Sequence, residues 1–289
     1  QWVGVHTNIT LQKIAEQKLS TVATGLEKQV QDRTKNLAIA NEQLSENNLS
    51  LQILNKELQT FSYVASHDLQ EPLRKIQTMA SRIIETESAL SEKGKDYFDR
   101  IQKAAGRMQA LIEDLLSYNS LNNVQGRKLV KTDLNVIIEE VKTLLSVIIT
   151  ETKATIIVKP LCDVNIIPYQ FRQVMLNLIS NALKFTKPGI APVITIKSQQ
   201  VKSSKINIEG LPALKEYCKI TVADNGIGFE EAYNEKIFEI FQRLHDKDDY
   251  PGTGIGLAIV KKIVENHNGA IRAKGKQGKG TTFEIYLPV

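Results

Sequence analysis

The sequence of 289 residues has little cysteine, few aromatic residues and no long apolar run. Cys162 and Cys218 are isolated from each other and from histidine along the chain, which argues against a zinc site. So few cysteines in a chain of this size favour a reducing compartment, and we expect a cytoplasmic protein. No stretch approaches the ~18 apolar residues of a transmembrane helix. We therefore expect no membrane segment in this chain.

Excess charge is also scarce. Lys and Arg exceed Asp and Glu by 37 to 32, a formal net charge of +5, and no basic run carries interleaved aromatic residues. This balance gives no reason to expect nucleic-acid binding. The chain starts at Gln1 without a Met or a signal peptide, so we expect a fragment of a longer protein.

The N-terminal third contains a short alternating segment and then a long polar one. Residues 2–6 predict a strand, the end of a domain that lies mostly outside this chain, which we assign to residues 1–10. Residues 11–60 predict a coiled coil and hence a parallel dimer, since the apolar stripe is too narrow for the alternative of a single helix packed on a globular body. The apolar residues that recur in heptad register are Leu26, Val30, Leu37, Leu44, Leu51, Leu54, Leu58 and Phe61.

Residues 61–122 predict a helical hairpin. The first helix continues past Pro72, where a kink is expected near Asp68, and residues 91–94 are expected to form the turn. The second helix follows a three-four apolar spacing from Tyr97 to Tyr118. One hairpin buries too little surface alone, so two of them are expected to form a dimeric four-helix bundle.

His67 lies at the edge of the apolar seam of the first helix. An isolated histidine there would usually be an ordinary surface or core-edge residue. Asp68 follows directly, however, and could orient the imidazole and take its proton. Because histidine has an ordinary pKa near ~6.5, the neutral nucleophilic form dominates at neutral pH. With the helix loosened at Pro72, these are features of an activated nucleophile.

A polar connector at residues 120–127 predicts a hinge, and residues 123–289 then alternate helices with strands. Asp133 is expected to cap one helix and residues 169–185 to form another. Strands are expected at residues 155–158, 193–196, 219–222, 270–273 and 282–287. The pattern predicts an α/β sandwich, a mixed sheet with helices on one face.

Three segments of this region together predict a nucleotide pocket rather than ordinary turns. Asp224 could accept a hydrogen bond from an exocyclic amine such as that of adenine, and Gly226 and Gly228 would let the backbone approach a flat ligand. Gly252, Gly254 and Gly256 precede the apolar run from Leu257 and open a helix, so free N–H groups would face an anion.

Asparagines supply the third segment. Asn177 and Asn181 lie four residues apart on one predicted helix face and suit a metal–phosphate cluster, and Lys184 can reach the same side. The alternative is simple polarity of a helix surface. The presence of all three segments favours the pocket.

The chain from Phe61 to the C-terminus resembles the sensor histidine kinases of two-component systems, and its start resembles the end of a PAS sensor domain followed by a signalling helix. The segments that resemble the family's H, N, G1, F and G2 boxes and its closing glycine segment are residues 61–76, 177–186, 224–229, 237–241, 252–260 and 278–283.

The resemblance implies a multidomain protein in which the helical bundle precedes an ATP-binding domain of the GHKL type. It implies that His67 receives the γ-phosphoryl group of ATP, with Asp68 as acid/base, and passes it to an aspartate of a separate response regulator. Asp224 would bind adenine and Asn181 would coordinate Mg²⁺. The supporting pocket residues would be Asn177, Lys184, Gly226, Gly228, Gly252, Gly254, Gly256 and Leu257.

Two alternatives compete with this interpretation. ATPases resembling the Hsp90, gyrase and MutL families share the fold but place a Glu general base where this chain has Asn177, so hydrolysis should be slow. A non-catalytic dimeric scaffold is the second alternative, and the intact boxes argue against it.

Two details of the active centre stay open in the sequence. Arg243, His245 and Lys247 could contact phosphates, although an exposed charged loop is the simpler interpretation. Glu71 stands where many relatives have Thr or Asn to position water, so we expect weak phosphatase activity toward the regulator.

Overall fold

The computed structural model describes residues 9–86, 90–121, 128–203, 206, 211, 216–244, 250 and 252–289. Contacts divide the chain into two units, residues 1–61 and 62–289. The strand expected at residues 2–6 and most of the hinge expected at 120–127 lie outside the described residues. No helix in the described part of the chain has the length and apolarity needed to cross a bilayer.

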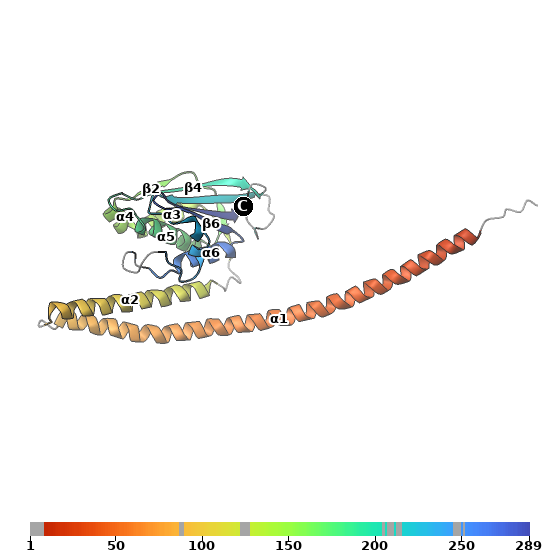
Figure 1. Cartoon of the computed structure of the whole chain (residues 1–289), viewed down its shortest axis with the longest axis horizontal. Helices are drawn as coiled ribbons and strands as arrows, with labels where there is room; N and C mark the ends of the chain where they lie inside the picture. The colour runs from red at the N-terminus through yellow and green to blue at the C-terminus, as the bar shows by residue number, and fades with distance from the viewer. Residues whose placement is uncertain are drawn as a thin grey trace, which may run out of the picture. The chain divides into compact units, whose positions relative to one another are not determined.

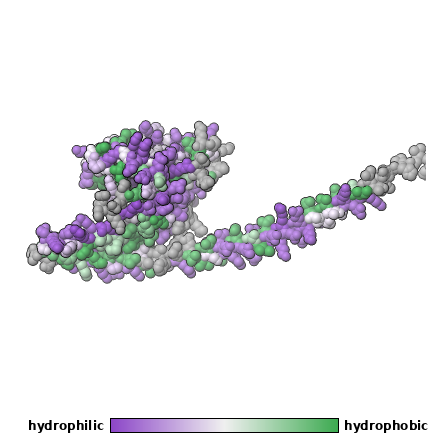
Figure 2. All heavy atoms as spheres, in the orientation of Figure 1, coloured by the Kyte–Doolittle hydropathy of each residue, from purple (hydrophilic) through white to green (hydrophobic). Residues whose placement is uncertain are grey.

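The first unit is the N-terminal part of helix α1 (Ile9–Thr86). The absence of Pro and the scarcity of Gly before Pro72 allow the backbone to stay helical without interruption. Figure 2 shows apolar residues recurring along this polar rod. Leucines and Val30 of the predicted heptads are 58–63% exposed in the single chain: Leu26, Val30, Leu37, Leu44, Leu51 and Leu54.

The second unit begins with a helical hairpin formed by the end of α1 and by α2 (Glu92–Ser120). Ser66, Leu73 and Ala80 are buried at a spacing of seven, and Gln102 Nε2 donates a hydrogen bond to Ser81 Oγ at 2.7 Å across the hairpin. The turn expected at residues 91–94 is instead the start of α2. Ser91 is its N-cap, because its hydroxyl accepts the Gly94 N–H.

The apolar seam predicted for the first hairpin helix is only partly buried within one chain. Leu73 is 7% exposed, whereas Leu69 and Ile76 are 55% and 44% exposed. The hairpin therefore has one apolar face turned inward and a second one open to solvent in the single chain.

The rest of the second unit is built on a five-stranded sheet. Its strand order is β2-β4-β5-β7-β6, with β2 and β4 parallel and the other neighbours antiparallel. These strands are β2 (Thr155–Val158), β4 (Val193–Lys202), β5 (Glu216–Asp224), β6 (Ala270–Lys276) and β7 (Gly280–Pro288). All five contain a predicted strand, which confirms the mixed sheet.

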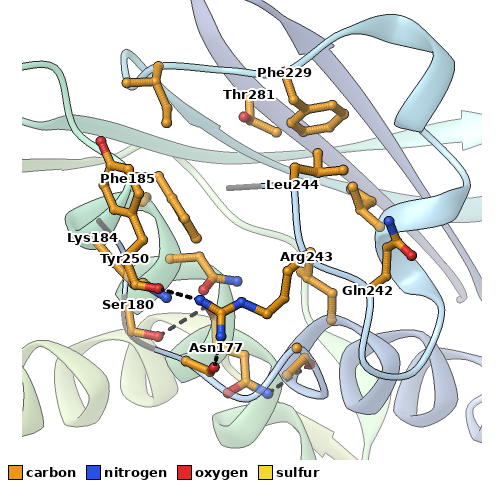
Figure 3. Close-up of a pocket in the computed structure, with 18 of the residues that line it drawn as sticks. Asn177, Ser180, Lys184, Phe185, Phe229, Gln242, Arg243, Leu244, Tyr250 and Thr281 are labelled. Atoms are coloured by element: carbon orange, nitrogen blue, oxygen red, sulfur yellow. Dashed lines mark hydrogen bonds between the residues drawn. The ribbon is translucent and has the colours of Figure 1, made fainter. Parts of the chain in front are cut away.

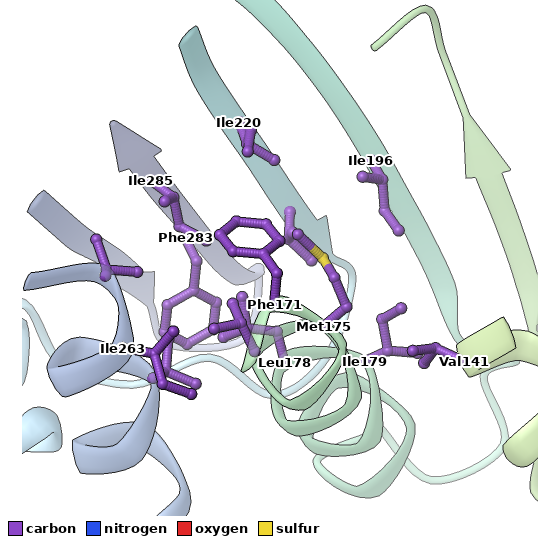
Figure 4. Close-up of a cluster of buried hydrophobic side chains, with 14 of the residues drawn as sticks. Val141, Phe171, Met175, Leu178, Ile179, Ile196, Ile220, Ile263, Phe283 and Ile285 are labelled. Atoms are coloured by element: carbon purple, nitrogen blue, oxygen red, sulfur yellow. The ribbon is translucent and has the colours of Figure 1, made fainter. Parts of the chain in front are cut away.

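Helices α3 (Leu134–Leu144), α5 (Pro168–Lys184) and α6 (Gly256–Asn266) cover one face of this sheet (Figures 1 and 4). Asp133 caps α3 as predicted, since its Oδ1 accepts the Asn135 N–H at 2.8 Å. Figure 4 shows the α5 side chains directed toward the strands. Each fully buried large apolar side chain contributes about 1.5–3 kcal/mol. The central ones include Phe171, Leu178, Ile179, Ile196, Ile220 and Ile285.

Among the α-helices and β-strands that the structure describes in this unit, three were not predicted from the sequence. Strands β1 (Val130–Thr132) and β3 (Val164–Ile166) pair in a separate antiparallel sheet, and α4 (Ser146–Thr152) follows α3. Helix α4 ends at Lys153, which adopts the left-handed conformation at φ 53°.

The two cysteines, which are far apart along the chain, influence each other in the folded domain. Both are free thiols, and Cys218 is buried. Ser198 Oγ donates to Cys162 Sγ at 3.1 Å. Burial, followed by contact with Cys162, raises the pKa of Cys218 to about 12. The described residues contain no group of three or more His, Cys, Asp or Glu side chains able to hold a metal.

Candidate functional site

A cavity of about 330 Å³ opens between α5, the end of β5, residues 237–244, 250 and 252–256, and β7 (Figure 3). Of the ten residues predicted to bind the nucleotide, all but Gly226 line it. The nine that do are Asn177, Asn181, Lys184, Asp224, Gly228, Gly252, Gly254, Gly256 and Leu257. Segments more than seventy residues apart in the sequence thus meet in one pocket.

Asp224 is the last residue of β5 and is half-buried at the pocket wall. Its Oδ1 accepts the Gly226 N–H at 2.8 Å and the Thr281 N–H at 3.1 Å. Burial raises the pKa of this carboxyl, and the two backbone donors partly oppose that effect. Among the described residues no group is seen to donate to Oδ2, so the second oxygen can accept a ligand hydrogen bond.

Close approach of the protein backbone requires glycine at positions 226 and 228. A Cβ on Gly226 would lie 2.2 Å from the Phe185 carbonyl oxygen, and one on Gly228 would lie 2.1 Å from that of Lys276. Gly228 also has a φ of 63°. These contacts alone explain both glycines, and the expected approach of a flat ligand to them stays a prediction.

Asn177 links α5 to the start of α6. Its Nδ2 donates to the Gly256 carbonyl at 3.1 Å, while its Oδ1 accepts from Gln173 Nε2 at 3.3 Å. Gly256 is the first residue of α6, so this amide holds the N-terminus of that helix beside the pocket. Asn181, one turn further along α5, lines the cavity and offers an amide oxygen.

Lys184 and Arg243 place two positive charges in the same cavity (Figure 3). Burial, and secondly the nearby Arg243 guanidinium, lower the pKa of Lys184. Arg243 donates to the carbonyls of Tyr250 and Gly252, both at 2.9 Å. The structure therefore puts Arg243 in the pocket rather than in an exposed loop. His245, Lys247 and Pro251 lie outside the described residues.

Gly254 lies at a backbone crossing beside the pocket. Its φ is 78°, and its carbonyl accepts the Phe241 N–H at 3.1 Å. A Cβ on Gly254 would lie 3.0 Å from the Phe241 carbonyl carbon. This pairing connects the segment after η3 (Lys236–Phe238) to the glycine loop ahead of α6.

Asp114 of α2 is a pocket residue that the sequence analysis missed. Thr253 Oγ1 donates to its Oδ2 at 2.5 Å. The two residues are 139 positions apart, and no local pattern in the sequence could have linked them. Thr281 was missed as an individual contact for the same reason.

The proposed phospho-acceptor pair lies on α1. Asp68 is exposed and takes part in an interaction with its surroundings. The side chain of His67 lies outside the described residues, although its backbone is helical. The geometry of this pair toward the pocket therefore stays a prediction.

Two known family models match this chain. Residues 57–124 match the model of the His Kinase A (phospho-acceptor) domain. Residues 167–289 match that of the histidine kinase-, DNA gyrase B-, and HSP90-like ATPases. The chain thus carries the two domains of a histidine kinase. Both matches fall on the predicted segments: the hairpin with His67 and the α/β sandwich with its pocket.

Individual relatives agree with the family models. This chain is 36% identical over 249 residues to the phytochrome-like protein Cph1 of Synechocystis sp., covering 86% of this chain and 31% of that protein. It is 35% identical over 236 residues to cyanobacterial phytochrome A of Nostoc sp., covering 81% and 29%. The chain therefore spans about three tenths of the length of these curated relatives.

A solved structure also matches. The full-length structure of ShkA in complex with AMPPNP superposes with a TM-score of 0.56 at 26% identity, covering 78% of this chain and 45% of that one. The histidine kinase fold, a helical phospho-acceptor region followed by an α/β ATPase sandwich, is thereby confirmed.

Proposed function

We propose that this protein is an ATP-dependent histidine kinase that phosphorylates itself on His67 and passes the phosphoryl group to an aspartate of a separate response regulator. The observation that carries the proposal is the polarity of the cavity. An oriented carboxylate, Asp224, lines it together with two cations, Lys184 and Arg243, of which Arg243 is bonded to the glycine loop. Figure 3 shows Thr281, whose N–H bonds Asp224, apart from both cations.

This arrangement fits the two ends of ATP. Oδ2 of Asp224 would accept a hydrogen bond from the exocyclic amine of adenine, since Oδ1 is occupied by two backbone donors. Lys184, Arg243 and the N-terminus of α6 at Gly256 would neutralise the phosphates. Transfer of a phosphoryl group depends mainly on such positioning and charge neutralisation.

Mg²⁺ would be held chiefly by the phosphates, with the amide oxygen of Asn181 as a protein ligand. Oxygen donors and few protein ligands are what this ion prefers. The lack of a carboxylate cluster among the described residues fits that sparse ligand set. When bound, the ion would offset charge on the transferring group.

The chemical step joins a ring nitrogen of His67 to the γ-phosphorus. The N–P bond forms as the bond from that phosphorus to the bridging oxygen breaks, and ADP leaves with the electron pair. The proton on the other ring nitrogen would pass to Asp68. The phosphoryl group then moves to a carboxylate oxygen of the regulator as the N–P bond breaks, and the proton returns from Asp68 to the ring, which restores the neutral imidazole.

Asn177 favours this transfer over hydrolysis. An ATPase of the same fold would use a carboxylate at this position to deprotonate water, whereas an amide is not a base. The Asn177 amide is hydrogen-bonded to Gln173 and to the Gly256 carbonyl, which supports a structural role beside the phosphates.

A homodimer would supply the setting. The open apolar face of the hairpin, with Leu69 and Ile76, and the heptad leucines of α1 would be covered by a second copy. The connector at residues 120–127 would let the ATP-binding domain reach His67. A signal from upstream of this chain would act through the coil.

The test is incubation with γ-labelled ATP and Mg²⁺. Wild type should acquire label that is acid-labile, as phosphohistidine is, and His67→Ala should acquire none. Label that persists in His67→Ala would overturn the assignment of His67. Binding of an ATP analogue without any labelling would support the scaffold alternative instead.

A further inference from the structure

The last two turns of α2 dock on the ATP-binding domain. Leu111, Leu115 and Tyr118 pack against its core, and Leu121, which follows α2, is buried. Asn266 Nδ2, at the end of α6, donates to the Leu121 carbonyl at 2.8 Å. The hairpin helix and the ATP-binding domain therefore share a specific interface, part apolar and part hydrogen-bonded.

Asp114 is the acidic residue that this docked helix brings to the nucleotide pocket. Its Oδ2 accepts the Thr253 hydroxyl at 2.5 Å, and Thr253 stands between Gly252 and Gly254. The carboxylate thus lies on the glycine loop, in the same cavity wall as Lys184 and Arg243. That is the end of the cavity assigned above to the phosphates.

A carboxylate at this place disfavours bound phosphates, whereas Lys184, Arg243 and the N-terminus of α6 favour them. Two like charges repel, and at a partly buried site solvent screens them less than at the surface. Asp114 should not act on adenine in this way, because Asp224, the proposed adenine ligand, is bonded to Gly226 and Thr281 and not to the glycine loop. Figure 3 shows Thr281 apart from Lys184 and Arg243.

We propose that Asp114 is a residue that sets phosphate specificity: while α2 is docked, it weakens binding of nucleotides in proportion to their phosphate charge. By linkage, a bound triphosphate weakens the docking of α2 to the same degree. ATP binding would then release the hairpin from its contact with Thr253, and the freed hydroxyl could bond a phosphate oxygen. This inference rests on the proposed ATP site.

The matched pair of variants is Asp114→Asn and Glu113→Gln. Both remove one negative charge from the same turn of α2, but Glu113 is exposed and bonded only within its helix, to Gln109 at 3.0 Å. Asp114→Asn keeps an oxygen that can accept the Thr253 hydroxyl, so the fold should survive. Calorimetric titration of the whole chain with ATP, ADP and adenosine compares the three ligands.

Asp114→Asn should tighten ATP binding roughly threefold to tenfold at low salt, tighten ADP binding less and leave adenosine unchanged. Glu113→Gln should leave all three unchanged. Equal gains for the three ligands, a gain of the same size in Glu113→Gln, or weaker ATP binding by Asp114→Asn would each overturn the inference.

Hydrogen exchange gives the second readout. ATP should increase amide exchange over residues 111–121 in wild type, and Asp114→Asn should lose most of that increase, because the repulsion that couples ATP to docking is gone. Exchange that ATP leaves unaltered would overturn the coupling while leaving the kinase assignment intact. Failure of wild type to bind ATP at all would overturn the proposed function and this inference together.

Discussion

Asp224 is the residue on which nucleotide recognition is expected to depend. In Asp224→Asn the amide oxygen can keep the bonds from Gly226 and Thr281, but an N–H₂ group then faces the adenine amine. An unmade hydrogen bond to a charged group costs about 1.5–3 kcal/mol, so ATP affinity should fall roughly tenfold to a hundredfold or more. Calorimetric titration measures this loss.

Asp163→Asn is the matched control. Asp163 is an exposed aspartate that pairs with Lys131 at 3.2 Å on the separate two-stranded sheet. The control should bind ATP like wild type. Because the pKa of Asp224 is raised, ATP affinity should also weaken on acidification at a higher pH than for an ordinary aspartate. An Asp224→Asn protein with unchanged affinity would contradict the role in adenine binding.

His267 should make the stability of the domain sensitive to acid. It is 2% exposed, its Nε2 accepts the Ile167 N–H at 2.9 Å, and its Nδ1 contacts the Ile263 carbonyl at 2.7 Å. A backbone N–H can only donate, so the ring must be neutral with its proton on Nδ1. Burial lowers the pKa of His267 accordingly.

The sign follows from which state binds more protons. Below the ordinary histidine pKa of about 6.5 the unfolded chain takes up a proton that the folded chain refuses, so the free energy of unfolding falls as pH drops. Urea unfolding at pH 7.5 and 5.5 should show this loss in wild type and less of it in His267→Gln, whose amide can make both contacts. An equal loss in the two proteins would assign the effect to other groups.

Glu71 should limit phosphatase activity. It forms an ion pair with Lys75 at 2.7 Å one turn along α1 and carries no hydroxyl or amide to orient water. Glu71→Thr should raise the rate of regulator dephosphorylation roughly tenfold or more. A time course of label on the regulator measures it. Glu71→Gln also removes the negative charge but supplies an amide in place of the hydroxyl of Glu71→Thr, so comparing the two variants shows whether loss of charge alone raises the rate. A fast wild-type rate of dephosphorylation that depends on the His67 helix would contradict the prediction.

Residues with a local motif were predictable, and residues brought in by tertiary contact were not. Asp224, Lys184 and the glycines stand in short segments whose spacing carries a chemical reason. Asp114 and Thr281 reach the pocket from other elements, through contacts that no periodicity encodes. Arg243 stayed undecided because only the carbonyls of Tyr250 and Gly252 fix its direction.

At the scale of elements, two glycines of the pocket should differ sharply in how well they tolerate substitution by alanine. Gly228→Ala would place a methyl group 2.1 Å from the Lys276 carbonyl oxygen at a φ of 63°, and it should lower the free energy of unfolding by at least about 2–3 kcal/mol. Gly256→Ala meets Asn177 only at 3.7 Å in the first turn of α6 and should change stability by less than about 1 kcal/mol. Urea unfolding compares the two, and similar losses would contradict the steric argument.

Elements were predictable where they were long enough to show a period. The five strands of the main sheet alternate over at least four residues, and α5 carries an apolar face over 17 residues. Strands β1 and β3 have three residues each, too few to reveal alternation, and they exist because they pair with each other. The seven residues of α4 are likewise shorter than two full turns.

At the scale of the whole molecule, the coil should transmit its signal by rotational phase. Insertion of one or two residues between positions 37 and 51 turns the seam of α1 by about 100° per residue, whereas seven restore it within about 20°. Autophosphorylation should therefore vary with insertion length and return at seven. A flat response, measured with γ-labelled ATP, would contradict coupling through the coil.

The domain boundaries proposed from the sequence, 1–10, 11–60, 61–122 and 123–289, stay predictions. They were placed where the apolar pattern changes, first from heptads to a three-four spacing and then to alternating helices and strands. What the sequence could not supply is the docking of α2, because its apolar residues serve a hairpin and a domain interface at once. Leu115 and Tyr118 carry the same pattern for either purpose.

The bond from Asn266 to the Leu121 carbonyl stands where the connecting peptide begins. Six residues separate Leu121 from Lys128, so the tether spans at most about 25 Å when extended. A connector this short keeps the ATP-binding domain and the hairpin that carries His67 at an effective concentration of the order of millimolar. Once a dimer has formed, the rate of self-phosphorylation should be independent of dilution, and the cell could set it only by changing geometry, not abundance.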